Sequence, residues 1–177
     1  ELGVVRNLCA AKKLGVASTI VMPLAAPQAK IDATRSYGAT VELVGKDFQA
    51  AMAHARDLVA GTDAEFVHAF DDPDIVAGQA TLGVEMDEDL PSVDTVVVPI
   101  GGGGLIGGIG VAFAKLSPDT RIVGVQAESA ATVPDSLQKG APQTLSSVDT
   151  VADGIATGGV SELTLSLIEE HVDEVVT

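Results

Sequence analysis

Four consecutive glycines, Gly101 to Gly104, are the residues of this sequence with the clearest chemical meaning. A glycine has no Cβ and accepts positive φ angles, so a run of glycines exposes successive backbone N–H groups. Where such a loop leads into a helix, the positive end of the helix dipole also attracts an anion. The pattern therefore predicts a phosphate-binding loop. Because no lysine or arginine lies between Arg56 and Lys115, the backbone amides must supply the positive charge.

The same glycines also fit the pattern of a dinucleotide-binding loop. Gly102, Gly104 and Gly107 have the required spacing, and Glu128 follows about 20 residues later, where such folds hold a ribose. The pattern is weak by itself, and this strand comes late in the chain. A nicotinamide-dinucleotide module, or a non-catalytic binding domain, therefore stays as an alternative. For Gly107, Gly108 and Gly110 we expect a packing role.

The histidines and one aspartate complete the candidates for chemistry. His54, His68 and His171 lie far apart, without cysteine or acidic residues at metal-ligand spacing, so we expect no zinc site. His68 is interpreted as a hydrogen-bonded wall residue, not a base. Asp153 lies beside Gly154, where either catalytic support or a helix cap fits its position.

The glycine run belongs to a long charge-free window. From Thr95 to Ala114 no residue is charged, and a window of about 20 residues has the length of a membrane span. Pro99 and the glycines would break such a helix inside the bilayer. The window instead predicts a strand at 95–100 that is buried on both faces of a parallel sheet, then the loop, then a helix at 105–115.

Strands alternating with helices indicate an α/β fold with open, mainly parallel twisted sheets and helices on both faces. We place the boundary between two lobes near the acidic turn 71–74, giving a small lobe at 1–70 and a cofactor-binding lobe at 71–177; this turn is also expected to cap a helix. The other predicted strands are 18–22, 40–44, 65–68, 122–125 and 174–176, and the predicted helices are 27–37, 48–60, 75–87, 105–115, 134–139 and 163–171, the last capped by Ser161.

Composition limits the partners. The formal net charge is −15 and aromatic residues make up 3%, which disfavours nucleic acid and anionic membranes. A single cysteine, Cys9, excludes an internal disulfide, and no export signal opens the sequence. We therefore expect a cytoplasmic protein with neither nucleic-acid nor membrane partners.

The segment Val97–Leu105 resembles the tetraglycine loop of the fold type II pyridoxal-phosphate (PLP) enzymes, in the threonine dehydratase and serine racemase branch. Other segments resemble that branch in the same order: Ala10–Val16, Thr19–Pro23, Lys30–Arg35, Tyr37–Ala39, Phe70–Pro73, Ala77–Gln79 and Ala152–Ala156. The resemblance covers the middle of the catalytic unit, so we expect an incomplete tryptophan synthase β-like fold.

The resemblance implies that pyridoxal 5'-phosphate is the cofactor. The amides of Gly101, Gly102, Gly103, Gly104 and Leu105 would hold its phosphate, Gly154 would lie beside its ring, and Phe70 would line the pocket. It further implies a homo-oligomer that acts on a small amino acid. The implied activity is a threonine or serine dehydratase, which releases ammonia and leaves a 2-oxo acid; a serine racemase-like enzyme is the alternative.

Two departures from the family limit these expectations. Several members bind a divalent cation through acidic residues at the positions of Gln126 and Thr132, with a further ligand at Ala130; an amide and a hydroxyl replace the two carboxylates here, so we expect no metal site. The family's cofactor-linked lysine lies in a Ser-x-Lys segment before the matched region and has no counterpart in these residues. We therefore expect no catalytic residue in this chain, and a fragment that is inactive by itself.

Overall fold

The computed structural model describes residues 2–177 as two compact units, one that ends at Val67 and one that spans His68–Thr177. Each unit contains a parallel sheet with helices packed against it. The predicted α/β class with parallel sheets is confirmed. The unit boundary lies a few residues before the acidic turn where the sequence placed it.

The first unit has two parallel strands. Thr19 pairs with Thr40 and Met22 with Leu43, while α2 contacts β2 and α3 contacts β1. Gly38, with φ of 91°, ends α2 in the predicted left-handed conformation. The elements of this unit are α1 (Leu2–Leu14), β1 (Thr19–Met22), α2 (Gln28–Ser36), β2 (Thr40–Leu43) and α3 (Phe48–Val59).

Two features of this region differ from the sequence-based prediction. Helix α1 was not predicted, and the strand predicted at 65–68 is wrong, because those residues form no strand. Val67 is 54% exposed and Phe66 packs against the guanidinium of Arg56. Phe66 and His68 are more buried than their neighbours, but the run pairs with no strand among the described residues, and pairing is what stabilises a strand in a sheet.

The second unit has a three-stranded parallel sheet with the strand order β3-β4-β5. Its elements are α4 (Pro73–Asp89), β3 (Thr95–Pro99), α5 (Gly104–Leu116), β4 (Arg121–Val125), η1 (Glu128–Ala130), α6 (Val133–Lys139), η2 (Asp153–Ile155), α7 (Glu162–His171) and β5 (Glu174–Val176). The predicted caps are confirmed: Asp72 accepts hydrogen bonds from the amides of Asp74 and Ile75, and Ser161 accepts one from Thr164.

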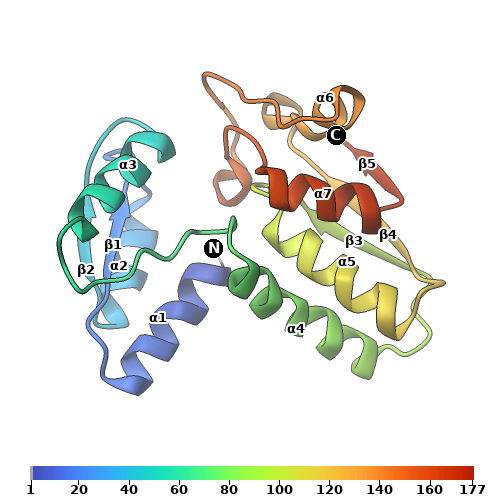
Figure 1. The fold of residues 1–177 in the computed structure, drawn as a ribbon, viewed down its shortest axis with the longest axis horizontal. Helices are drawn as coiled ribbons and strands as arrows, with labels where there is room; N and C mark the ends of the chain where they lie inside the picture. Colours follow the sequence, from blue (N-terminus) through green and yellow to red (C-terminus); the bar gives the residue numbers. More distant parts are fainter. Residues whose placement is uncertain (1) are drawn as a thin grey trace. The chain divides into compact units, whose positions relative to one another are not determined.

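Helix α5 is the central helix of this unit and packs against β3, α4 and α7 (Figure 1). Ile106, Ile109 and Phe113 of α5 are buried together with Val96 and Val98 of β3. The prediction that β3 is buried on both faces is wrong, since Val97 is 63% exposed. Side chains alternate along a strand, and α5 covers only the face that carries Val96 and Val98.

The charge-free window divides into β3, the glycine loop and most of α5. Helix α5 has 13 residues, fewer than the about 20 that a membrane-spanning helix needs. Among residues 2–177, no helix has both the length and the apolar character required to cross a membrane.

Candidate functional site

The glycine loop lies where β3 ends and α5 begins, as the sequence predicted. Gly103 occupies the N-cap position of α5 with φ of 90°, a left-handed conformation that favours glycine. The carbonyl oxygen of Gly103 accepts the hydrogen bond of Gly107 N at 2.9 Å and so begins the helix. The positive end of the α5 dipole is therefore at the loop.

The backbone amides from Gly101 to Ile106 make no hydrogen bond within the described chain. Before them, Ile100 N donates to the carbonyl of Val125 at 2.7 Å, and after them Gly107 N donates to Gly103. Unbonded donors at the start of a helix are the usual ligands of a bound anion. The loop can thus receive an anion without breaking any internal hydrogen bond.

Phe70 packs directly against this loop. A Cβ built on Gly102 would lie 2.3 Å from the Phe70 ring, and one on Gly104 would lie 3.0 Å from the Cβ of Phe70. His68 shapes this turn, because its Nδ1 accepts hydrogen bonds from the amides of Phe70 and Asp71, at 3.2 and 2.8 Å. The expected hydrogen bonding of His68 is confirmed, and its place in a pocket wall stays a prediction.

Thr164 of α7 also contacts the loop, and sequence analysis missed it. Its side chain is fully buried, and its hydroxyl donates a hydrogen bond of 2.8 Å to the carbonyl oxygen of Gly102. A Cβ on Gly103 would lie 2.8 Å from the Cβ of Thr164. The available signal was the cap at Ser161: a capping box makes the third residue after the cap a structural partner, and that residue is Thr164.

The segment around Gly154 lies next to the first glycine of the loop. Gly154 is the middle residue of the 3-10 turn η2, and a Cβ built on Gly101 would lie 3.1 Å from the Cα of Ile155. The structure therefore brings the segment that contains Gly154 beside Gly101 through Ile155, which is distant from Gly101 in sequence. Asp153 begins this turn and its carbonyl accepts the amide of Ala156 at 3.3 Å; its two suggested roles stay predictions.

At Gln126, where the resemblance suggested an acidic cation ligand in some relatives, the structure has a hydrogen-bonded amide. Gln126 is 2% exposed; its Nε2 donates to the carbonyl of Ala130 at 3.2 Å, and its Oε1 accepts from Val133 N at 2.9 Å. The hydroxyl of Thr132 is buried without a hydrogen-bond partner among the described residues. A divalent cation such as Mg²⁺ or Ca²⁺ prefers carboxylate ligands, so an amide already occupied at both ends does not fit one.

The three glycines inside α5 serve packing, as predicted. A Cβ on Gly107 would lie 3.1 Å from the Leu167 side chain, and one on Gly110 would lie 2.8 Å from His171, both on α7. A Cβ on Gly108 would lie 2.6 Å from the carbonyl oxygen of Val76 in α4. Gly107, the third glycine of the dinucleotide pattern, is therefore explained by helix contacts alone.

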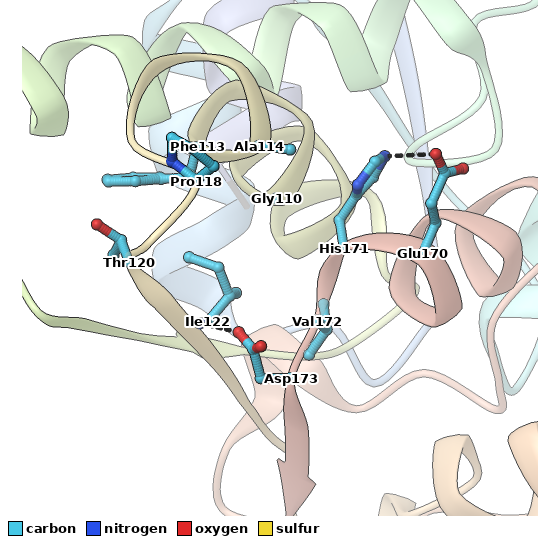
Figure 2. A pocket seen from close by; sticks show the side chains of 10 residues that line it. All are labelled: Gly110, Phe113, Ala114, Pro118, Thr120, Ile122, Glu170, His171, Val172 and Asp173. Atoms are coloured by element: carbon cyan, nitrogen blue, oxygen red, sulfur yellow. Dashed lines mark hydrogen bonds and ion pairs between the residues drawn. The ribbon is translucent and has the colours of Figure 1, made fainter.

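A cavity of about 210 Å³ lies at the other end of α5, between that helix, the start of β4 and the end of α7 (Figure 2). Its polar groups contact one another or the backbone. His171 pairs with Glu170 at 3.8 Å, and Asp173 accepts a hydrogen bond from Ile122 N at 2.7 Å. Across the described residues no group of three or more histidine, cysteine, aspartate or glutamate side chains is arranged to hold a metal.

Known proteins resemble nearly the whole chain. It is 45% identical over 167 residues to an L-threonine ammonia-lyase of Thermotoga maritima, covering 94% of this chain and 42% of that protein. Among solved structures, the processed threonine deaminase isoform 2 of Solanum lycopersicum matches with a TM-score of 0.87 at 40% identity, covering 96% of this chain and 47% of that one. Maize serine racemase matches with a TM-score of 0.90 at 29% identity, covering 98% of this chain and 52% of that one.

The chain thus spans about half the length of these relatives, or less. The family model described as pyridoxal-phosphate dependent enzyme matches residues 7–177. This match covers both compact units and includes the glycine loop with the turn of Phe70, the Thr164 contact and the Gly154 segment. The chain belongs to the pyridoxal-phosphate dependent enzyme family.

Proposed function

We propose that the amides of Gly101, Gly102, Gly103, Gly104 and Leu105 bind the phosphate of pyridoxal 5'-phosphate and that Gly154 lies beside its ring. The run of amides without an internal acceptor, at the start of α5, carries this proposal. Hydrogen bonds to a charged group contribute about 1.5–3 kcal/mol each. Several such bonds bind a phosphate without a basic side chain.

The loop residues fit this group sterically as well as chemically. Gly102 has Phe70 on its Cβ side, and Gly103 has Thr164 there. The side-chain positions of these glycines are thus occupied by protein, and only glycine combines this packing with amides that have no internal acceptor. This chain's contribution is to bind and orient the cofactor.

We further propose that the complete protein is a threonine or serine ammonia-lyase. When bound, pyridoxal phosphate supplies a ring system that stabilises negative charge developing on an amino-acid substrate. The identities of 45% and 40% to a threonine ammonia-lyase and a threonine deaminase, against 29% to a serine racemase, favour elimination of the β-hydroxyl over racemisation. A cytoplasmic homo-oligomer is part of the same proposal, and light scattering of the purified protein tests the oligomer.

The binding proposal is tested with pyridoxamine 5'-phosphate, which lacks the aldehyde that reacts with surface lysines, and with pyridoxamine as the matched ligand without phosphate. We expect the phosphate ester to shift the ¹⁵N–¹H signals of Gly101–Leu105, inorganic phosphate to compete, and pyridoxamine to leave the signals unchanged. Shifts produced equally by both amines would overturn the phosphate assignment. Binding of NADH at the loop without competition by phosphate would favour the dinucleotide alternative.

A control variant separates loop chemistry from general stability. Gly78 lies in α4, and a Cβ there would meet no atom of the described residues within 4 Å. Gly78→Ala should bind pyridoxamine 5'-phosphate as the parent does. The ammonia-lyase activity is tested on the complete protein with threonine and serine, by the appearance of the 2-oxo acid. None of these 177 residues matches the family's lysine, so we expect no 2-oxo acid from them alone.

A further inference from the structure

We propose that Thr164 is a positioning residue, whose hydroxyl holds the peptide between Gly102 and Gly103 in the orientation that presents the Gly103 amide to phosphate. This inference rests on the proposed phosphate-binding function of the loop. It assigns a role in ligand binding to a side chain of α7, which is 62 positions from Gly102 in the sequence.

The contact is specific and shielded from water. The Oγ1 atom of Thr164 donates to the carbonyl oxygen of Gly102 at 2.8 Å, and it accepts a hydrogen bond from Ser161 N at 3.0 Å. Because the Thr164 side chain has no exposed surface, water cannot replace this donor. A buried carbonyl that loses its only such partner is unfavourable, so the hydroxyl fixes the direction of the Gly102 carbonyl.

The direction of one carbonyl determines the direction of the next amide. In a planar trans peptide, the C=O and N–H bonds point to opposite sides. With the Gly102 carbonyl directed at Thr164, the Gly103 N–H points away from α7, and no described residue accepts a hydrogen bond from it. In the proposed complex, phosphate would meet this amide on the side opposite to Thr164.

The loop needs such a restraint because glycines allow the peptide to rotate. Gly102 and Gly103 both lack a Cβ, so the barriers that limit φ and ψ in other residues are low on either side of this peptide. A rotated peptide would direct the negative end of the carbonyl dipole toward the anion and remove one donor. The hydroxyl of Thr164 stabilises the binding orientation against the rotated one.

A purely structural role for Thr164 is the competing explanation. The same hydroxyl takes part in the capping box of α7: it accepts from Ser161 N at 3.0 Å, while the Ser161 side chain accepts from Thr164 N at 3.2 Å. Loss of the cap alone weakens the helix. Ser161→Ala tests the cap separately: it removes the Ser161 hydroxyl, including its 3.1 Å contact with the Thr164 Oγ1 atom, but keeps the Thr164 hydroxyl that donates to the Gly102 carbonyl.

The test compares Thr164→Val, which is isosteric but has no hydroxyl, with Thr164→Ser, which keeps it, and with Ser161→Ala. Affinity for inorganic phosphate and for pyridoxamine 5'-phosphate is measured on the full chain by titration of the Gly103 and Gly104 amide signals. We expect Thr164→Val to weaken both affinities by about 3- to 10-fold, the equivalent of one net hydrogen bond. Thr164→Ser and Ser161→Ala should keep parental affinity.

The outcomes distinguish this inference from the function on which it rests. If the parent chain binds neither probe, the phosphate-binding proposal fails. If the parent binds and Thr164→Val binds equally well, or if Ser161→Ala weakens binding as much as Thr164→Val does, the positioning role fails alone. Should Thr164→Val not fold, Thr164→Cys replaces it, since a thiol is only a weak donor; parental affinity in that variant also contradicts the proposal.

Discussion

Two groups of glycines lie within ten residues of each other and do different work. In the loop, Gly102 and Gly103 have Phe70 and Thr164 on one side and unbonded amides in their backbone. Inside α5, Gly108 has ordinary helical geometry, and a Cβ built on it would meet the backbone of α4. The first group is needed for conformation and for access of a ligand, and the second for the distance between helices.

The difference teaches that a glycine-rich segment is not one functional unit. The phosphate pattern and the dinucleotide pattern are both defined by the spacing of glycines, and neither depends on which residues pack beside each glycine. In the structure, Gly107 faces Leu167 of a neighbouring helix. Substitutions in the two groups should therefore have separable effects, on ligand affinity for the loop and on the free energy of unfolding for the helix.

The largest effect on stability is expected from Gly108→Ala. The new Cβ would lie 2.6 Å from the Val76 carbonyl oxygen and 2.7 Å from Ala80 N, and backbone atoms of a packed helix move less readily than side-chain ends. We expect a loss of about 3 kcal/mol in the free energy of unfolding, the upper part of the range for overpacking. Urea denaturation measures it; a loss below about 1 kcal/mol would show that α4 and α5 separate easily.

Gly103→Ala should lower both the free energy of unfolding and the affinity for phosphate. A residue other than glycine pays about 1–2 kcal/mol for a left-handed conformation, and the Cβ would also lie 2.8 Å from Thr164. We expect a loss of about 2 kcal/mol in stability together with a loss of phosphate binding of at least tenfold. Denaturation and phosphate titration of the same sample check the two parts, and unchanged phosphate affinity would contradict the distinct role given to the loop.

The loss of stability caused by Gly102→Ala should depend on Phe70. The added methyl group would lie 2.3 Å from the Phe70 ring, so Phe70→Ala should provide space for it. In a double-mutant cycle, Gly102→Ala is expected to cost about 1.5 kcal/mol less in the Phe70→Ala background than in the parent, within the usual range for residues in contact. Additive changes in the free energy of unfolding would mean that the two residues do not compete for one space.

The smallest effect is expected from Gly78→Ala, and its sign is opposite. Within the part of the chain that the structure describes, no atom lies within 4 Å of a Cβ built at this position in α4. Alanine loses less backbone entropy on folding, so we expect a gain of about 0.5–1 kcal/mol in the free energy of unfolding. A loss of stability in urea denaturation would show that Gly78 has a packing role like that of Gly108.

Local features of the sequence predicted much of the structure. The helix signals at Asp72 and Ser161 depend on hydrogen bonds within the first turn, and the signal at Pro27 depends on its fixed φ; the structure contains all three helices near the predicted bounds. The strand predicted at 65–68 failed because a strand needs a paired neighbour, which a four-residue window does not reveal. Such a window also does not reveal that only one face of β3 is covered, which leaves Val97 exposed.

The glycine run by itself predicted a loop between a strand and a helix whose amides have no internal acceptor, because glycines without Cβ atoms allow the backbone conformations that this needs. Which side of the loop is covered depended on tertiary structure. Phe70 and Thr164 reach Gly102 and Gly103 only when the 68–71 turn and α7 pack beside α5. Contacts between distant segments follow from how helices and strands pack, and the spacing of residues along one segment does not predict them.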